Sequence, residues 1–163
     1  MTDFKAAVRA LADVGVEFIL VGGVAATVHG SARLTGDIDV VYRRSNENIH
    51  RLVRALSVHH PYLRGAPPGL PFRWDEATIQ RGLNFTLTTD IGDFDVLGEI
   101  VSGGSYETLL PNTVTISLYG VECRCVTLDT LIRVKRAAGR PKDLEAVAEL
   151  EALLEERRRL EGR

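Results

Sequence analysis

The sequence predicts an α/β protein with a mixed, mainly antiparallel twisted sheet flanked by helices. Segments in which apolar and polar residues alternate, as in strands, are interspersed with segments whose apolar residues recur every three or four positions, as in helices. Two pairs of predicted strands, 83–89 with 93–97 and 113–118 with 121–126, are separated by turns short enough for β-hairpins. These hairpins are the reason for expecting antiparallel pairing.

The first half of the chain predicts three helices and two strands. Apolar residues at Phe4, Val8 and Leu11 share one helical face, and Gly15 suits the end of that helix. Ser45 is a suitable N-cap for the third helix. In order, the predicted elements are helix 3–14, strand 17–21, helix 23–29, strand 37–42 and helix 45–58.

The second half begins with a segment, 59–82, that is rich in proline and glycine. Long loops of this kind tend to be functional or mobile, and a short helix is expected within it at 75–80. The elements predicted after it are strands 83–89 and 93–97, a helical turn at 106–110, strands 113–118 and 121–126, and helices 128–138 and 142–160. Pro141 fits the first turn of the last helix. Without repeats or a clear boundary, residues 1–163 are expected to form one domain, with C-terminal helices at about 128–160.

The composition is that of an ordinary globular protein. Of 163 residues, 45% are apolar and 26% are charged, and no apolar run is long enough to span a membrane. The N-terminus lacks the apolar core of a signal peptide, so a cytoplasmic location is expected. A net charge of −2 argues against a broad nucleic-acid-binding surface. Cys123 and Cys125 are too few for a zinc site and are expected to be packing residues.

The segment 37–40 carries two acidic residues on one face of a strand. Asp37 and Asp39 are two positions apart, so their side chains project together while Ile38 and Val40 point to the core. Neighbouring carboxylates repel each other, and a divalent cation such as Mg²⁺ is the usual compensation. The pattern therefore predicts a metal site, although an ordinary junction with a surface aspartate pair is the plain alternative.

A glycine pair precedes this strand at the junction of a predicted strand and helix. Gly22 and Gly23 allow the backbone to approach a ligand closely, and the start of the next helix offers N–H groups to an anion. A phosphate cradle and a metal-binding carboxylate pair thus occur in consecutive elements. These two features together are typical of sites for metal-assisted phosphoryl or nucleotidyl transfer.

The string from Gly22-Gly23 through thirteen residues to Asp37-Ile38-Asp39-Val40 resembles the signature of the polymerase-β-type nucleotidyltransferase superfamily. It is most similar to small prokaryotic members, related to minimal nucleotidyltransferases and to abortive-infection toxin–antitoxin nucleotidyltransferases. The resemblance implies the nucleotidyltransferase fold, a nucleoside triphosphate (NTP) substrate and a two-metal Mg²⁺ site. Many members have serine at the position of Gly23, so a hydroxyl ligand to phosphate is missing there.

A third carboxylate is expected from an adjacent strand, to bind the second metal and to help deprotonate the attacking hydroxyl. In the families that the chain resembles, this acid is followed by two apolar residues, and Asp95 before Val96-Leu97 fits. Asp93 is interpreted as a hairpin-turn residue, and Glu99 is a weaker candidate.

Four further residues are candidates on chemical grounds. Arg33 and Thr35 precede the acidic strand, where the guanidinium would pair with phosphate or screen the carboxylates, or else lie on the surface. Lys135 borders the buried face of its predicted helix and is assigned to the triphosphate. Lys142 is a weaker phosphate candidate, and it and Asp143 are expected to pair at the start of the last helix.

The expected function is Mg²⁺-dependent transfer of a nucleoside monophosphate (NMP) from an NTP to a hydroxyl of RNA or protein, within a toxin–antitoxin system. Asp37, Asp39 and Asp95 are the predicted catalytic and metal-binding residues, and Gly22 and Gly23 are assigned to phosphate. A helical toxin or antitoxin partner is implied by the resemblance. The alternative is a non-catalytic, antitoxin-like binding module on the same fold. Transfer to a small molecule ranks lower, because the chain has little room for a separate acceptor domain.

Overall fold

The structure is a computed structural model that describes residues 1–162. Its helices are α1 (Phe4–Val14), α2 (Gly22–Val28), α3 (Asn46–Ser57), α4 (Glu76–Arg81), α5 (Tyr106–Leu109), the 3-10 turn η1 (Leu110–Asn112), α6 (Leu128–Ala138) and α7 (Pro141–Glu161). Its strands are β1 (Phe18–Val21), β2 (Asp37–Tyr42), β3 (Tyr62–Leu63), β4 (Asn84–Thr89), β5 (Gly92–Leu97), β6 (Glu99–Ile100), β7 (Gly104–Ser105), β8 (Thr113–Leu118) and β9 (Val121–Val126).

Seven strands form one mixed sheet in the order β3-β4-β5-β2-β1-β9-β8, and β6 pairs separately with β7. Within the large sheet, β2 with β5 and β1 with β9 are parallel pairs. The other four pairs are antiparallel, including the two predicted hairpins. The expected mixed, mainly antiparallel sheet is confirmed.

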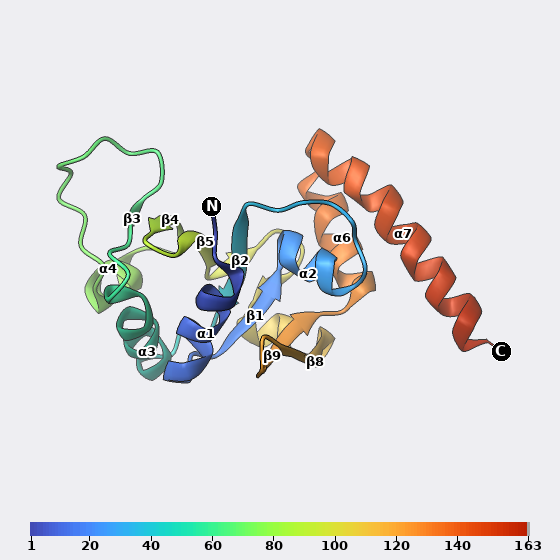
Figure 1. Cartoon of the computed structure of the whole chain (residues 1–163), viewed down its shortest axis with the longest axis horizontal. Helices are drawn as coiled ribbons and strands as arrows, with labels where there is room; N and C mark the ends of the chain where they lie inside the picture. The colour runs from blue at the N-terminus through green and yellow to red at the C-terminus, as the bar shows by residue number, and fades with distance from the viewer. Residues whose placement is uncertain (163) are drawn as a thin grey trace.

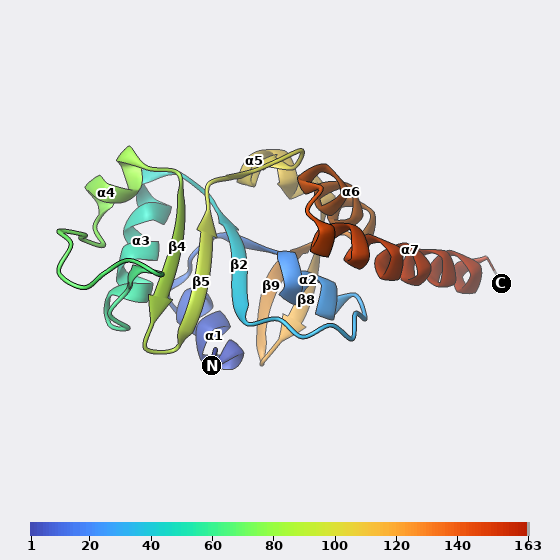
Figure 2. The same ribbon diagram turned by 90° about the horizontal axis from the view of Figure 1, so that it is seen from above.

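Helices cover both faces of the sheet (Figures 1 and 2). Helices α1 and α3 pack side by side on one face, where Ile38, Val40 and Phe94 are fully buried. Helices α2 and α6 lie together on the opposite face, and α7 packs on α6 before extending away from the sheet. The acidic positions of β2 alternate with its core positions, so they face the side of α2 and α6.

The predicted elements match the observed ones to within one or two residues at most ends. Asp3, Ser45 and Asp75 accept hydrogen bonds from main-chain N–H groups as N-caps of their helices, and Gly15 ends α1 in the left-handed conformation. The short strands β3, β6 and β7 were not predicted, since two-residue strands carry no periodicity. Within residues 1–162, no helix is both long and apolar enough to cross a membrane.

Candidate active site

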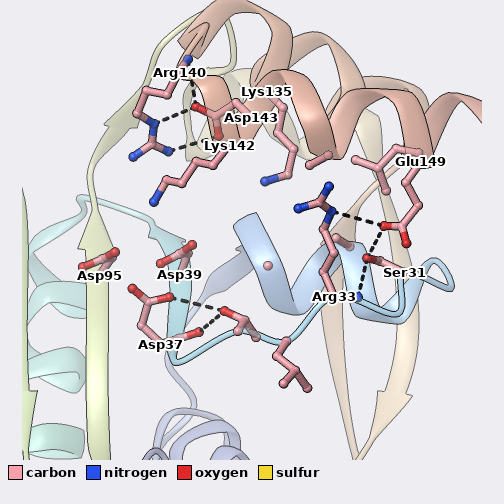
Figure 3. A pocket seen from close by; sticks show the side chains of 16 residues that line it. Ser31, Arg33, Asp37, Asp39, Asp95, Lys135, Arg140, Lys142, Asp143 and Glu149 are labelled. Atoms are coloured by element: carbon pink, nitrogen blue, oxygen red, sulfur yellow. Dashed lines mark hydrogen bonds and ion pairs between the residues drawn. The ribbon is translucent and has the colours of Figure 1, made fainter.

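Parallel pairing of β2 with β5 creates a cluster of carboxylates. In the register of this pair, Asp37 lies beside Asp93 and Asp39 lies beside Asp95. Asp37, Asp39 and Asp95 each offer a carboxylate oxygen, and these oxygens all lie within 4.8 Å of one another. The structure therefore brings together the three acids that the sequence analysis selected (Figure 3).

The junction of β1 and α2 lies directly against this cluster. Strand β1 is antiparallel to β2, and its last residue, Val21, is opposite Asp39. The next residue, Gly22, has a φ of +65°, and a Cβ atom there would lie 1.9 Å from Asp39 Oδ2. A side chain at this position would therefore displace the carboxylate. Val21, the N-cap residue of α2, makes no side-chain hydrogen bond to the helix, as expected for a junction that offers its N–H groups to a ligand.

The space beside the second glycine is filled by a hydroxyl. A Cβ atom at Gly23 would lie 2.5 Å from Thr35 Oγ1 and 2.7 Å from Thr35 Cβ. The Thr35 hydroxyl donates towards Asp37, whose main-chain oxygen is 3.2 Å away and whose Oδ1 is 3.4 Å away. Thr35 thus supplies a hydroxyl next to the position where a serine side chain at residue 23 would begin.

Burial and mutual repulsion raise the pKa of two of the acids. Burial and the adjoining carboxyl groups of Asp95 and Asp37 together raise the pKa of Asp39 to about 8. Burial and the charge of Asp95 raise the pKa of Asp37, and Arg64 partly opposes this shift. Asp39 Oδ1 and Asp95 Oδ1 are buried and have no hydrogen-bond partner within residues 1–162. Closely spaced carboxylates with free oxygens fit a hard divalent cation, so the donor set suits Mg²⁺.

Arg64 is a site residue that the sequence analysis missed. Its Nη1 atom lies 3.2 Å from Asp95 Oδ1 and 3.5 Å from Asp37 Oδ2, and its Nε atom lies 3.6 Å from Asp93 Oδ2. The contact with Asp95 is an ion pair without hydrogen-bond geometry. Asp93 is accordingly a residue of β5 that faces Arg64, and its interpretation as a turn residue is wrong. Arg64 follows β3 in an irregular segment, where no pattern in the sequence marks it.

Basic side chains from α6, α7 and the loop before β2 face the acids across a polar hollow (Figure 3). Lys135 and Lys142 extend towards the carboxylates in this view. Arg33 lines the same hollow but pairs with Glu145 (3.8 Å) and Glu149 (3.9 Å) of α7. Arg33 makes no ion pair with the three clustered acids within residues 1–162.

The predicted pair of Lys142 and Asp143 is wrong. Asp143 is 3% exposed and binds Arg140, which donates from Nε (2.6 Å) to Oδ2 and from Nη2 (3.2 Å) to Oδ1. Burial acts to raise the pKa of Asp143, but the hydrogen bonds and charge of Arg140 outweigh it and lower the pKa. Lys142 is left to line the polar hollow.

A second, more apolar hollow adjoins the first. Asp39, Lys135, Arg140 and Asp143 border both hollows, so they form the wall between them. The second hollow is otherwise lined largely by apolar side chains, from Val21, Leu97, Ile100, Val101, Leu131, Val134 and Ala138. Glu99 lines this hollow and is not one of the three clustered acids.

Comparison with known proteins identifies the fold. No protein-family model matches the sequence, and no curated protein matches it. The structure is similar to that of LnuA, a lincosamide antibiotic adenylyltransferase solved with lincomycin bound, with a TM-score of 0.62 at 12% identity, over 94% of this chain and 98% of that one. It is also similar to a candidate nucleotidyltransferase from Thermotoga maritima, with a TM-score of 0.54 at 13% identity, over 91% of this chain and 94% of that one. The chain therefore has the nucleotidyltransferase fold.

Proposed function

We propose that the chain is a metal-dependent nucleotidyltransferase, which transfers an NMP from an NTP to an acceptor hydroxyl. The observation that carries this proposal is the cluster of Asp37, Asp39 and Asp95, whose ligand oxygens lie within 4.8 Å of one another on a nucleotidyltransferase fold. Two of its oxygens are buried without a partner within residues 1–162. Bound Mg²⁺ would supply charge neutralisation for the reacting phosphate.

The polar hollow is suited to the triphosphate. Lys135, Lys142 and Arg33 line it, and lysine and arginine are common ligands of phosphate groups. The N-terminus of α2 and the Thr35 hydroxyl lie beside the acids, where main-chain N–H groups and a hydroxyl would bind phosphate oxygens. In this arrangement the basic residues orient the donor and the acids face its α-phosphate.

Asp95 is the proposed base. Its Oδ1 atom is buried and makes no hydrogen bond within residues 1–162, so it is able to accept a proton. The acceptor oxygen would lose its proton to this carboxylate and form a bond to the α-phosphorus. The bond from that phosphorus to the bridging oxygen breaks, and pyrophosphate leaves with the electron pair.

The acceptor is proposed to be a hydroxyl of RNA, protein or a small molecule. The sequence analysis ranks small molecules lower because the chain has little room for a separate acceptor domain, but LnuA, a lincosamide antibiotic adenylyltransferase, is similar to this chain over 98% of its own length. A separate acceptor domain is therefore not a requirement of the fold. A place in a toxin–antitoxin system, with a helical partner chain, remains a proposal that rests on the sequence resemblance alone.

The proposal is tested with α-labelled NTPs and Mg²⁺, offered with total RNA, cell extract and a panel of small hydroxyl compounds. Wild type should label one class of acceptor, and Asp39→Asn should not. Equal labelling by both proteins would contradict the assignment of the acids. Failure of the wild type both to label and to bind nucleotide would favour a non-catalytic binding module.

A further inference from the structure

Arg64 is anchored to the sheet independently of the acids that it faces. Its guanidinium donates from Nη2 to the main-chain oxygens of Leu87 (2.9 Å) and Phe94 (3.0 Å), and from Nε to that of Leu87 (3.3 Å). Its own main-chain N–H donates to Thr86 (3.0 Å). These acceptors belong to paired strands, so they hold the guanidinium in place whatever the charge of the carboxylates.

This anchored cation lies against two of the three proposed metal ligands. It is 3.2 Å from Asp95 Oδ1 and 3.5 Å from Asp37 Oδ2, and the side chain is 27% exposed. Asp39 has no such contact, and its Oδ1 has no hydrogen-bond partner within residues 1–162. The acids therefore have an anchored, ion-paired positive charge on one side, whereas the charge of Lys135 acts on Asp39 without an ion pair within residues 1–162.

A second cation placed among the same carboxylates would be repelled by this charge. Partial burial strengthens that repulsion, because the effective dielectric constant is lower than in water. A triphosphate in the polar hollow would bring additional negative charge to the site and would offset the repulsion. The anchored guanidinium thus weakens the attraction between the three carboxylates and a divalent cation in the absence of nucleotide.

We propose that Arg64 is a positioning residue that lowers the affinity of the empty carboxylate cluster for a divalent cation, so that metal and NTP bind together. This inference rests on the proposed function, and it adds a residue and an order of binding to it. Arg64 acts through the carboxylates and is not assigned contact with the reacting atoms. Its anchorage by Leu87 and Phe94 is what distinguishes it from a mobile surface arginine.

The test is a titration with Mn²⁺, in which electron paramagnetic resonance measures the free ion. Wild type, Arg64→Gln and Arg64→Lys are compared with and without a non-hydrolysable NTP analogue. Without the analogue, Arg64→Gln should bind Mn²⁺ at least about tenfold more tightly than wild type. Arg64→Lys keeps the charge and should stay within about threefold of wild type. With the analogue, all three affinities should converge.

The outcomes separate the inference from the proposed function. If wild type and Arg64→Gln bind Mn²⁺ equally without nucleotide, the inference is overturned and the metal site stands. If Arg64→Lys binds as tightly as Arg64→Gln, the effect is structural and the inference is again overturned. If none of the three proteins binds Mn²⁺ with or without the analogue, both the inference and the proposed function are contradicted. Circular dichroism establishes that each variant is folded. If Arg64→Gln does not fold, Arg64→Lys still tests the inference, because a tenfold gain of Mn²⁺ affinity in Arg64→Lys would contradict it.

Discussion

The two ends of the acidic cluster have different electrostatic surroundings, although they lie two residues apart on one strand. At the outer end, Asp37 contacts the hydroxyl of Thr35 and the guanidinium of Arg64. At the inner end, Asp39 lies against Gly22 and has an oxygen with no hydrogen-bond partner within residues 1–162. The chain therefore pairs the charge at the outer end, whereas Asp39 at the inner end makes no ion pair within residues 1–162 and is opposed only by the nearby charge of Lys135.

Asp143 shows that burial alone does not explain this difference. It is also buried, but Arg140 holds it by two side-chain hydrogen bonds and its pKa is lowered, whereas the pKa of Asp39 is raised to about 8. A buried carboxylate without a partner costs free energy unless it is protonated or binds a cation. The comparison teaches that the inner end should respond most strongly to mutation, to pH and to metal.

The largest effect is expected from Asp39→Asn. Loss of this metal ligand should reduce nucleotidyl transfer by about 1000-fold or more, since bound metal supplies several kcal/mol of charge stabilisation. The same change removes an unpartnered buried charge, so at pH 8 without Mg²⁺ the free energy of unfolding should rise by about 1–3 kcal/mol. Label transfer and urea denaturation measure the two quantities. Asp93→Asn is the matched control, because Asp93 lies beside Asp37 at the outer end. If Asp93→Asn reduces nucleotidyl transfer as much as Asp39→Asn does, the two ends do not differ.

The next effect is expected from Gly22→Ala. The new Cβ would collide with Asp39 Oδ2, and residue 22 has a positive φ, so the free energy of unfolding should fall by about 2–4 kcal/mol. Gly36→Ala is the control, because a Cβ there meets nothing within 4 Å and φ is not positive. Thermal or urea denaturation compares the two variants. Equal stability of the two variants would show that Asp39 can move to accommodate a side chain at residue 22.

The stability of the inner end should depend on pH. The pKa of Asp39 is raised from 3.8 to about 8 on folding, so the folded state binds the proton more tightly than the unfolded state does. The contribution of Asp39 to stability is therefore greatest at low pH and falls as pH rises from about 4 to about 8, by up to about 1.4 kcal/mol per pH unit for one proton. Asp39→Asn should flatten this dependence, and Mg²⁺ added with a non-hydrolysable NTP analogue should stabilise the wild type more at pH 8 than at pH 6. Urea denaturation across this range measures the slope, and identical slopes in both proteins would contradict the raised pKa.

The smallest effect is expected at the compensated acid. Arg140→Ala leaves Asp143 buried without its partner and should lower the free energy of unfolding by about 1 kcal/mol. Lys142→Ala removes a neighbouring charge that makes no ion pair with Asp143 within residues 1–162, so its effect should be near zero. Urea denaturation at neutral pH compares the free energy of unfolding of the two variants. Because the pKa of Asp143 is lowered on folding, the difference should shrink as pH falls through the acid range.

Much of the fold was predictable because its elements carry local signals. The bounds of β2, β8, β9 and α6 match their predicted ranges, since each carries strand alternation or helical spacing over much of its length and glycine follows β8 and α6. The proximity of Asp37 and Asp39 follows from strand periodicity alone. Selecting Asp95 needed the family resemblance, because no local pattern encodes the register that places β5 beside β2.

The remaining site residues depend on contacts that a sequence does not display. Arg64 reaches the acids from an irregular segment, so neither periodicity nor a motif marks it. Adjacent residues of a helix point in different directions, whereas residues three apart share a face. This is why Asp143 pairs with Arg140 and not with Lys142.

The contact between Gly23 and Thr35 has an evolutionary consequence. A side chain at residue 23 and the hydroxyl of Thr35 would occupy the same space, so the chain has room for only one of them. The two positions are therefore expected to change together as lineages diverge. A relative with serine in place of Gly23 should have a small residue in place of Thr35. Such paired exchanges would move the hydroxyl from the loop before β2 to the junction of β1 and α2 without removing it.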